Sequence, residues 1–253
     1  MTAGRALATP TVRPTGPSAT TLLLVAHGSR DPRHSRTLRV LAERVRLLSG
    51  HRTAIAFLEF DEPDVAAAVS ALVTVGAGRV VVVPLLLSRA YHATTDLPAA
   101  LAGDWPVPVR RTDVLGGSPL LVTALERRLF EAGIDAADRG TTGVVVASTG
   151  SKDAQARDSV AAVARQLRRA GWGAALPAYV TGPQRRPGDA VRELRAGGLS
   201  RVAVAPYVLA PGLLPDRIAA EAREAGADVL SAPLGDAPEL VRLVVERGLG
   251  AVG

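Results

Sequence analysis

Short apolar runs alternate with longer amphipathic stretches along the chain. The runs Leu22–Ala26 and Arg79–Val83 consist mainly of aliphatic residues, which is typical of buried strands. Between them, Ser35–Leu48 repeats its apolar residues at the spacing of a helix. Strands that alternate with helices at this spacing predict parallel α/β sheets with helices on both faces.

The same pattern continues to the end of the chain. The expected strands are Leu22–Ala26, Ala54–Leu58, Arg79–Val83, Val107–Asp113, Gly143–Ala147, Ala174–Val180, Arg201–Ala205 and Asp228–Ser231. The expected helices are Ser35–Leu48, Pro63–Val75, Thr95–Leu101, Ser118–Phe130, Asp153–Ala170, Pro187–Ala196, Pro215–Ala225 and Pro238–Arg247. Several of these helices begin with proline, which is favoured in a first turn.

The two halves of this pattern resemble one another in sequence. A Gly-Ser-x-Asp motif at residues 28–31 returns at residues 150–153, and the same spacing pairs Pro84 with Pro206. A shared fold alone would repeat the hydrophobic pattern, but it would rarely repeat these residues in register. The sequence therefore predicts an internal duplication.

The duplication predicts two flavodoxin-like domains, each a four-stranded parallel sheet of order 2-1-3-4 flanked by helices. We expect residues 1–18 to form a disordered leader, because they are rich in Thr, Pro, Ala and Gly. Residues 19–139 would form an N-terminal domain that carries the site. Residues 140–253 would form a degenerate repeat that supplies the other wall of a cleft.

Ionisable residues follow three strands of the first half only. His27 and Glu59 stand at the ends of the first two expected strands, and His92 lies in the loop after the third. In open α/β sheets, ligands bind outside the carboxyl ends of the strands, where the strand order reverses. In the order 2-1-3-4, His27 and His92 would face each other across that crevice, with Glu59 to one side.

The equivalent positions of the second half are not ionisable. They hold Thr149, Thr181 and Leu214. Two imidazoles and a carboxylate suit a borderline divalent cation such as Fe, Co, Ni or Zn. The competing interpretation is that His27, Glu59 and His92 are ordinary turn residues whose polar groups have hydrogen-bond partners. His34 and His51 are expected on the surface, although His34 could lie on the rim of the cleft.

Composition removes several alternatives. Cys is absent, which excludes disulfides, Fe–S clusters and cysteine nucleophiles, and no apolar run is long enough to span a membrane. The net charge is +6, and Lys152 is the only Lys among 30 basic residues. With only 3% aromatic residues, the basic surface does not favour nucleic acid. We expect a cytoplasmic protein.

Arginines gather near the expected strand ends, and their forked guanidinium groups suit carboxylates. These arginines are Arg30, Arg33, Arg36, Arg89, Arg110 and Arg111. Gly28 and Ser29, between a strand and a helix, could also bind an anion through backbone N–H groups. Solvated surface charge is the alternative interpretation of each Arg.

Three segments resemble the motifs of the sirohydrochlorin chelatase family. The first is residues 25–32 (VAHGSRDP). The second is residues 57–59 (FLE), followed by residues 62–64 (EPD). The third is residues 83–92 (VPLLLSRAYH), which ends in the second His. The motifs stand in the family's order, and the second half resembles the family's degenerate repeat.

The resemblance implies an ATP-independent enzyme that inserts Fe²⁺ or Co²⁺ into sirohydrochlorin, for sirohaem or cobalamin synthesis. It implies that His27 and His92 hold or deliver the metal and that Glu59 assists. Motif residues beside them are expected to bind the substrate, namely Gly28, Ser29, Arg30, Ser88, Arg89 and Tyr91. The metal would be a substrate, without a tightly bound cofactor.

The duplicated chain already supplies both walls of a cleft, so a monomer would suffice. Two alternatives stay open. One is a chelatase for another metal, such as nickel, or for a protohaem-type substrate. The other is a non-catalytic carrier of tetrapyrrole or metal.

Overall fold

The computed structural model describes residues 20–89 and 92–251. The expected leader, residues 1–18, lies outside these ranges. The first half contains β1 (Thr20–Ala26), α1 (Pro32–Ser49), β2 (Arg52–Phe57), α2 (Val65–Thr74), β3 (Arg79–Pro84), a π-helix (His92–Asp96), α3 (Leu97–Leu101), β4 (Val109–Arg111) and α4 (Pro119–Glu131). After a 3₁₀ turn (Ala136–Thr141), the second contains β5 (Thr142–Ser148), α5 (Ala154–Arg169), β6 (Ala174–Tyr179), α6 (Pro187–Ala196), β7 (Arg201–Pro206), α7 (Leu213–Glu224), β8 (Val229–Leu230) and α8 (Pro238–Gly250).

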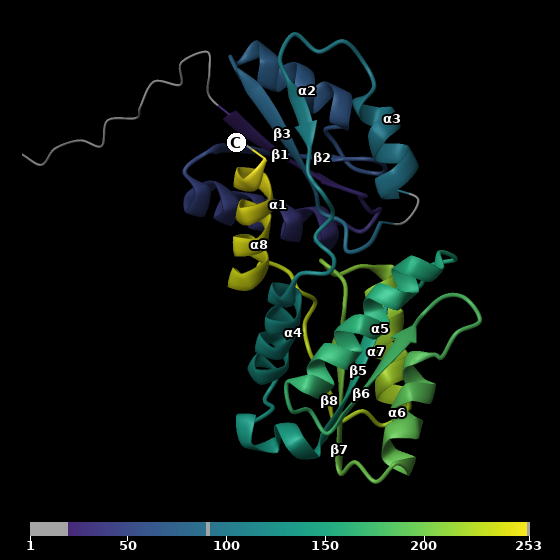
Figure 1. The fold of residues 1–253 in the computed structure, drawn as a ribbon. Helices are drawn as coiled ribbons and strands as arrows, with labels where there is room; N and C mark the ends of the chain where they lie inside the picture. The colour runs from purple at the N-terminus through teal and green to yellow at the C-terminus, as the bar shows by residue number, and fades with distance from the viewer. Residues whose placement is uncertain (1–19, 90–91, 252–253) are drawn as a thin grey trace, which may run out of the picture.

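Two parallel sheets with the same topology form the framework (Figure 1). Their strand orders are β2-β1-β3-β4 and β6-β5-β7-β8. All of the pairs are parallel, and β1 and β5 each lie between two neighbours. This confirms the predicted fold class and strand order. Among the helices described, none has the length and apolar character needed to cross a membrane.

The central strands are covered on both faces, which explains their continuous apolar sequences. Leu22, Leu23 and Leu24 of β1 are fully buried, although their side chains alternate between the two faces of the sheet. Leu22 and Leu24 belong to the largest core cluster, whereas Leu23 packs with residues of α2 on the other face.

The repeated Gly-Ser-x-Asp motif builds the same strand-to-helix turn twice. Asp31 caps α1 by accepting the backbone N–H of Arg33 at 2.9 Å, and Asp153 caps α5 by accepting that of Gln155 at 2.8 Å. In each turn, the hydroxyl of the motif's Ser accepts the backbone N–H of the Asp at 3.1 Å. The motif therefore returns because both halves need the same helix start.

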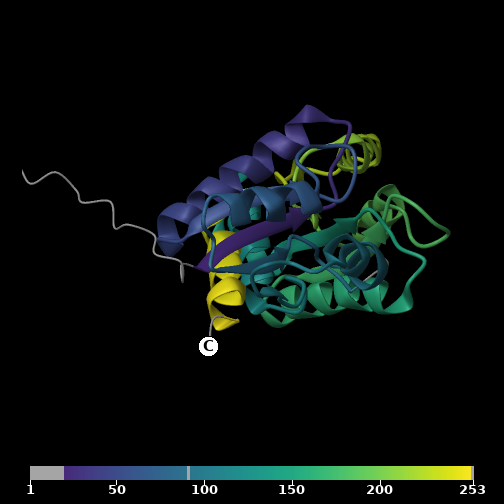
Figure 2. The same ribbon diagram turned by 90° about the horizontal axis from the view of Figure 1, so that it is seen from above.

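The last helix of each half packs across the molecule. Helix α4 lies against β7 and α5 of the second sheet, whereas α8 packs on α1 and β3 of the first. Figures 1 and 2 both place the yellow α8 beside the purple α1. At Gly248 of α8, an added Cβ would lie 3.0 Å from Leu22 of β1, so this helix approaches the first sheet closely. Each half therefore packs its last helix against the sheet of the other half. The expected domain bounds, residues 19–139 and 140–253, stay a prediction.

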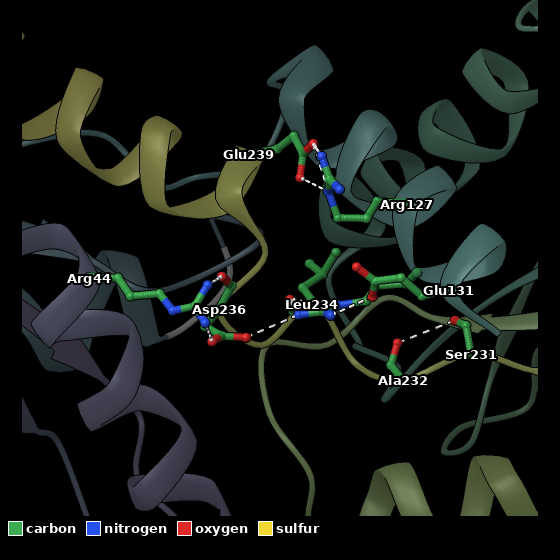
Figure 3. A network of polar contacts seen from close by, with 9 residues as sticks. Arg44, Arg127, Glu131, Ser231, Ala232, Leu234, Asp236 and Glu239 are labelled. Atoms are coloured by element: carbon green, nitrogen blue, oxygen red, sulfur yellow. Dashed lines mark hydrogen bonds and ion pairs between the residues drawn. The ribbon is translucent and has the colours of Figure 1, made fainter. Parts of the chain in front are cut away.

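Arginines of α4 connect the crossing segments (Figure 3). Arg128 donates hydrogen bonds to the carbonyl oxygen of Leu234, at 3.2 Å from Nε and 2.9 Å from Nη2. Asp236 lies 3.2 Å from Arg128 and 2.8 Å from Arg44 of α1. This cluster joins α4, the segment before α8, and α1, and it therefore fixes the two halves against each other.

Candidate active site between the two halves

A cavity of about 890 Å³ lies between the two halves. It is bordered by the segments that follow β1, β3, β5 and β7, together with part of α5. Its lining includes Ala26, His27, His34, Leu85, Ser88, His92, Ser148, Thr149, Lys152, Arg157, Tyr179, Tyr207 and Leu214. The carboxyl ends of parallel strands are where open α/β sheets bind ligands, and the volume lies in the range of small-molecule sites.

Two imidazoles stack in this cavity. His27 directly follows β1, and His92 begins the π-helix after β3. Their ring centroids lie 4.1 Å apart, and the ring planes are inclined by 29°. Phe60 packs edge-on against His27, at 5.9 Å between centroids. Because β1 and β3 are neighbours, the sheet brings together two residues that are far apart in sequence.

A carboxylate orients His92. Nδ1 of His92 lies 2.6 Å from Oδ2 of Asp96, one helical turn away. An imidazole that donates Nδ1–H to a carboxylate carries its lone pair on Nε2, which is the usual arrangement of a metal-binding His. The sequence was interpreted as a loop at His92 and a helix from Thr95, so the pairing of Asp96 with His92 was missed. A helix beginning at His92 would have placed Asp96 on the same face.

Burial favours the neutral form of His27 and His34. Burial lowers the pKa of His27 below its ordinary value, and the neighbouring His92 lowers it further. Burial also lowers the pKa of His34, which lies in the first turn of α1. Nδ1 of each ring is buried and lacks a hydrogen-bond partner among the described residues. His34, expected on the surface or the cleft rim, thus lines the cavity.

Glu59 lies at the solvent edge of the site. Its side chain is exposed and does not line the cavity, but its charge raises the pKa of His27 against the larger effect of burial. Its backbone N–H donates to the carbonyl oxygen of His27 at 2.8 Å. Within residues 20–89 and 92–251, no three potential ligands lie close enough to hold a metal together. The structure brings together His27 and His92, and it does not bring Glu59 into a three-ligand set.

Gly28 and Ser29 have structural partners. A Cβ at Gly28 would lie 1.7 Å from the carbonyl oxygen of Glu59, and its φ is +97°, so only glycine fits. The backbone N–H of Ser29, one of those expected to bind an anion, donates to Oδ2 of Asp61 at 2.9 Å. Arg30 is exposed and lies over the ring of Phe60, at 5.3 Å.

Among the described lining residues, the positive charge of the cavity comes from the second half. None of the six expected arginines is among its described lining residues. Arg33 pairs with Asp31 and Asp216, and Arg89 pairs with Asp113 at 2.7 Å. Ser88 lines the cavity as expected for a substrate contact, whereas Tyr91 lies outside the described residues.

Lys152 and Arg157 supply the cations of the second-half wall. The guanidinium group of Arg157 donates to the carbonyl oxygens of Ser151 and Lys152, at 2.9 and 2.7 Å, and so holds the loop after β5. Sequence reasoning missed both cations, although Lys152 occupies the position equivalent to Arg30. That correspondence was the available signal.

Comparison with known proteins extends over both halves. A sequence model of the CbiX family matches residues 21–132 and 143–249. The sirohydrochlorin cobaltochelatase of Methanocaldococcus jannaschii is 40% identical over 81 residues, which is 32% of this chain and 57% of that relative. The sirohydrochlorin ferrochelatase of Bacillus subtilis is 28% identical over 211 residues, which is 80% of this chain and 79% of that relative. The solved structure of SirB from Bacillus subtilis with Fe³⁺ superimposes with a TM-score of 0.79 at 25% identity, covering 90% of this chain and 94% of its own.

Proposed function

The chain belongs to the CbiX family, and from this premise we propose that it is a sirohydrochlorin chelatase, a lyase that inserts Fe²⁺ or Co²⁺ into the metal-free tetrapyrrole. The observation that carries the proposal is the stacked pair of His27 and His92, 4.1 Å apart, in the cavity between the halves. Relatives that share this family are named as a ferrochelatase and a cobaltochelatase of sirohydrochlorin. The metal enters as a substrate.

The donor set suits the metal ions proposed. Neutral imidazole nitrogen binds borderline divalent cations such as Fe²⁺ and Co²⁺. An imidazole nitrogen binds a metal through a lone pair that lies in the plane of the ring. The two rings are stacked with their planes inclined by 29°, so they would have to turn before both could bind one ion. Asp96 directs Nε2 of His92 as the coordinating atom, because it accepts the proton on Nδ1.

Insertion also requires removal of two protons from pyrrole nitrogens. One imidazole nitrogen cannot accept a proton and bind an ion at the same time, so the two tasks need separate groups. His34 lines the same cavity, where burial lowers its pKa and so favours its neutral form, and Glu59 lies beside His27 at the solvent edge. We assign proton acceptance to His34 or Glu59 and metal delivery to His27 and His92.

The second-half wall fits an acidic substrate. Sirohydrochlorin carries several carboxylates, and Lys152 and Arg157 face the cavity from this wall. Because one chain supplies both walls, we propose a cytoplasmic monomer that acts without a tightly bound cofactor. Ser88, Arg30, Arg89 and Tyr91 stay candidates for substrate contacts.

The test is the anaerobic absorbance of sirohydrochlorin with Fe²⁺ or with Co²⁺, in the presence and absence of the protein. A faster conversion to the metallated spectrum with either ion supports the chelatase, and the preferred ion indicates the pathway. A spectral shift on binding without faster insertion would instead identify a carrier and overturn the proposal.

A further inference from the structure

Tyr207 carries an unused hydroxyl in the second-half wall of the cavity. It directly follows β7, lines the cavity, and is only 2% exposed. Its hydroxyl lacks a hydrogen-bond partner among the residues that the structure describes. A buried hydroxyl without a partner costs free energy, so a native structure rarely keeps one without a reason.

The internal duplication shows that the fold does not need this hydroxyl. Leu85 occupies the equivalent position after β3 and is also 2% exposed. The backbone N–H of Leu85 donates to the carbonyl oxygen of Val25 in β1 at 2.7 Å. In the same way, the backbone N–H of Tyr207 donates to the carbonyl oxygen of Ala147 in β5 at 2.7 Å. The backbone is therefore the same in both halves, and an apolar side chain fills the site in the first. Packing explains the ring of Tyr207 but not its oxygen.

A second tyrosine of the same cavity makes the contrast clear. The hydroxyl of Tyr179 donates to the carbonyl oxygen of Arg157 at 2.9 Å, and so it has a structural task. Burial raises the pKa of Tyr207 well above its ordinary value, so its phenol keeps its proton. Tyr207 is consequently a neutral hydrogen-bond donor without an acceptor among the described residues.

We propose that the hydroxyl of Tyr207 donates a hydrogen bond to a carboxylate oxygen of the tetrapyrrole. This inference rests on the proposed function, because it names a contact to that substrate. Lys152 and Arg157 line the same wall and attract carboxylates to it, which favours a carboxylate over a ring nitrogen as the acceptor. The hydroxyl is buried before binding, so the contact forms as the cavity walls adjust around the ligand.

The experiment separates binding from stability in Tyr207→Phe, which removes only the oxygen. We expect the dissociation constant for metal-free sirohydrochlorin to rise about tenfold, as for loss of a hydrogen bond to a charged group. The melting temperature should stay equal or rise, because an unpaired buried group is removed. Tyr179→Phe is the stability control and should lower the melting temperature, since its hydroxyl has a partner. Tyr207→Leu, which reproduces Leu85, is a second variant that should fold and bind weakly.

Two results would overturn the assignment. A dissociation constant for Tyr207→Phe within twofold of the wild-type value would show that the substrate does not use the hydroxyl. A melting temperature lowered as far as that of Tyr179→Phe would show that the hydroxyl has a structural partner. If the wild-type chain itself failed to accelerate metal insertion, the proposed function would fail instead, so the two failures are distinguishable.

Discussion

Replacement of Gly28 by Ala tests the close approach that positions the first histidine. The added methyl carbon would lie 1.7 Å from the carbonyl oxygen of Glu59, at a residue with a φ of +97°. This carbonyl belongs to backbone, and it cannot turn aside as a flexible side chain can. The loop after β2 would therefore have to move away from the end of β1.

The size of the effect follows from two contributions. A residue with a side chain at positive φ costs roughly 1–2 kcal/mol. Displacement of the loop also breaks the hydrogen bond from Glu59 N–H to His27, which is 2.8 Å long, and a typical bond of this kind contributes about 1 kcal/mol. Together with residual strain, we expect the free energy of unfolding to fall by about 3 kcal/mol, which lowers Tm by roughly 6–12 °C in a chain of this length.

Gly76→Ala is the matched control. Gly76 also has a positive φ, +83°, but an added Cβ there would have nothing within 4 Å. It should therefore show the backbone cost alone, roughly 1–2 kcal/mol. Thermal unfolding followed by circular dichroism measures both variants. Equal losses of Tm in the two variants would refute the steric argument, because the contact with Glu59 would then contribute nothing.

Three further predictions concern a hydrogen bond, an ion-pair cluster and a protonation state. Asp96→Asn should slow metal insertion by about tenfold at unchanged Tm, because the orienting carboxylate of His92 is lost; an unchanged rate would contradict that role. Arg128→Met should lower the free energy of unfolding by about 2 kcal/mol, since the side chain of Arg128 is only 15% exposed. Arg242→Met is the control and should not change Tm measurably, because the side chain of Arg242 is 68% exposed. Burial lowers the pKa of His27 from 6.5, and the protonated ring has no lone pair left to bind a metal. The insertion rate should therefore fall with decreasing pH through a midpoint below 6.5. A midpoint above 6.5 would contradict this.

The hydrophobic pattern was sufficient for the sheets. The runs around β1 and β3 are apolar at successive positions, which indicated strands covered on both faces, and this arrangement was found. The duplicated motif also indicated the equivalent turns before α1 and α5. The pattern did not reveal that α4 and α8 exchange sheets. An amphipathic helix shows which of its faces is buried, but not which sheet covers that face.

The site was predictable only in part. The positions of His27 and His92 followed from strand order, because His27 directly follows β1 and His92 lies in the segment after the neighbouring strand β3. Asp96 was missed as a partner of His92 because the helix was expected to begin only at Thr95, whereas the π-helix already begins at His92. Tyr207 was not proposed from the sequence because an aromatic residue after a strand is ordinarily core. What distinguishes it is a buried hydroxyl without a hydrogen-bond partner among the described residues.

The cations that line the cavity among the described residues are not the arginines expected near the strand ends. Arginines near strand ends were counted as cleft residues, but a long side chain can turn to a nearby carboxylate, as Arg33 and Arg89 do. Lys152 stands in the half that lacks the histidines, and so it was not predicted as a residue of the cavity. Only the position of the second half against the first shows that this cation lines the same cavity as the histidines.

The most direct test of the account is the initial rate of metal insertion in three histidine variants, measured anaerobically with sirohydrochlorin and the preferred ion. His27→Ala and His92→Ala remove the stacked pair, and His51→Ala is the control, because His51 lies in the turn after α1 with Nδ1 2.9 Å from the carbonyl oxygen of Ser49. We predict that each of the first two variants loses about 100-fold in rate at unchanged Tm, while His51→Ala keeps the wild-type rate. Wild-type rates in folded His27→Ala and His92→Ala would contradict the central claim that these two imidazoles deliver the metal.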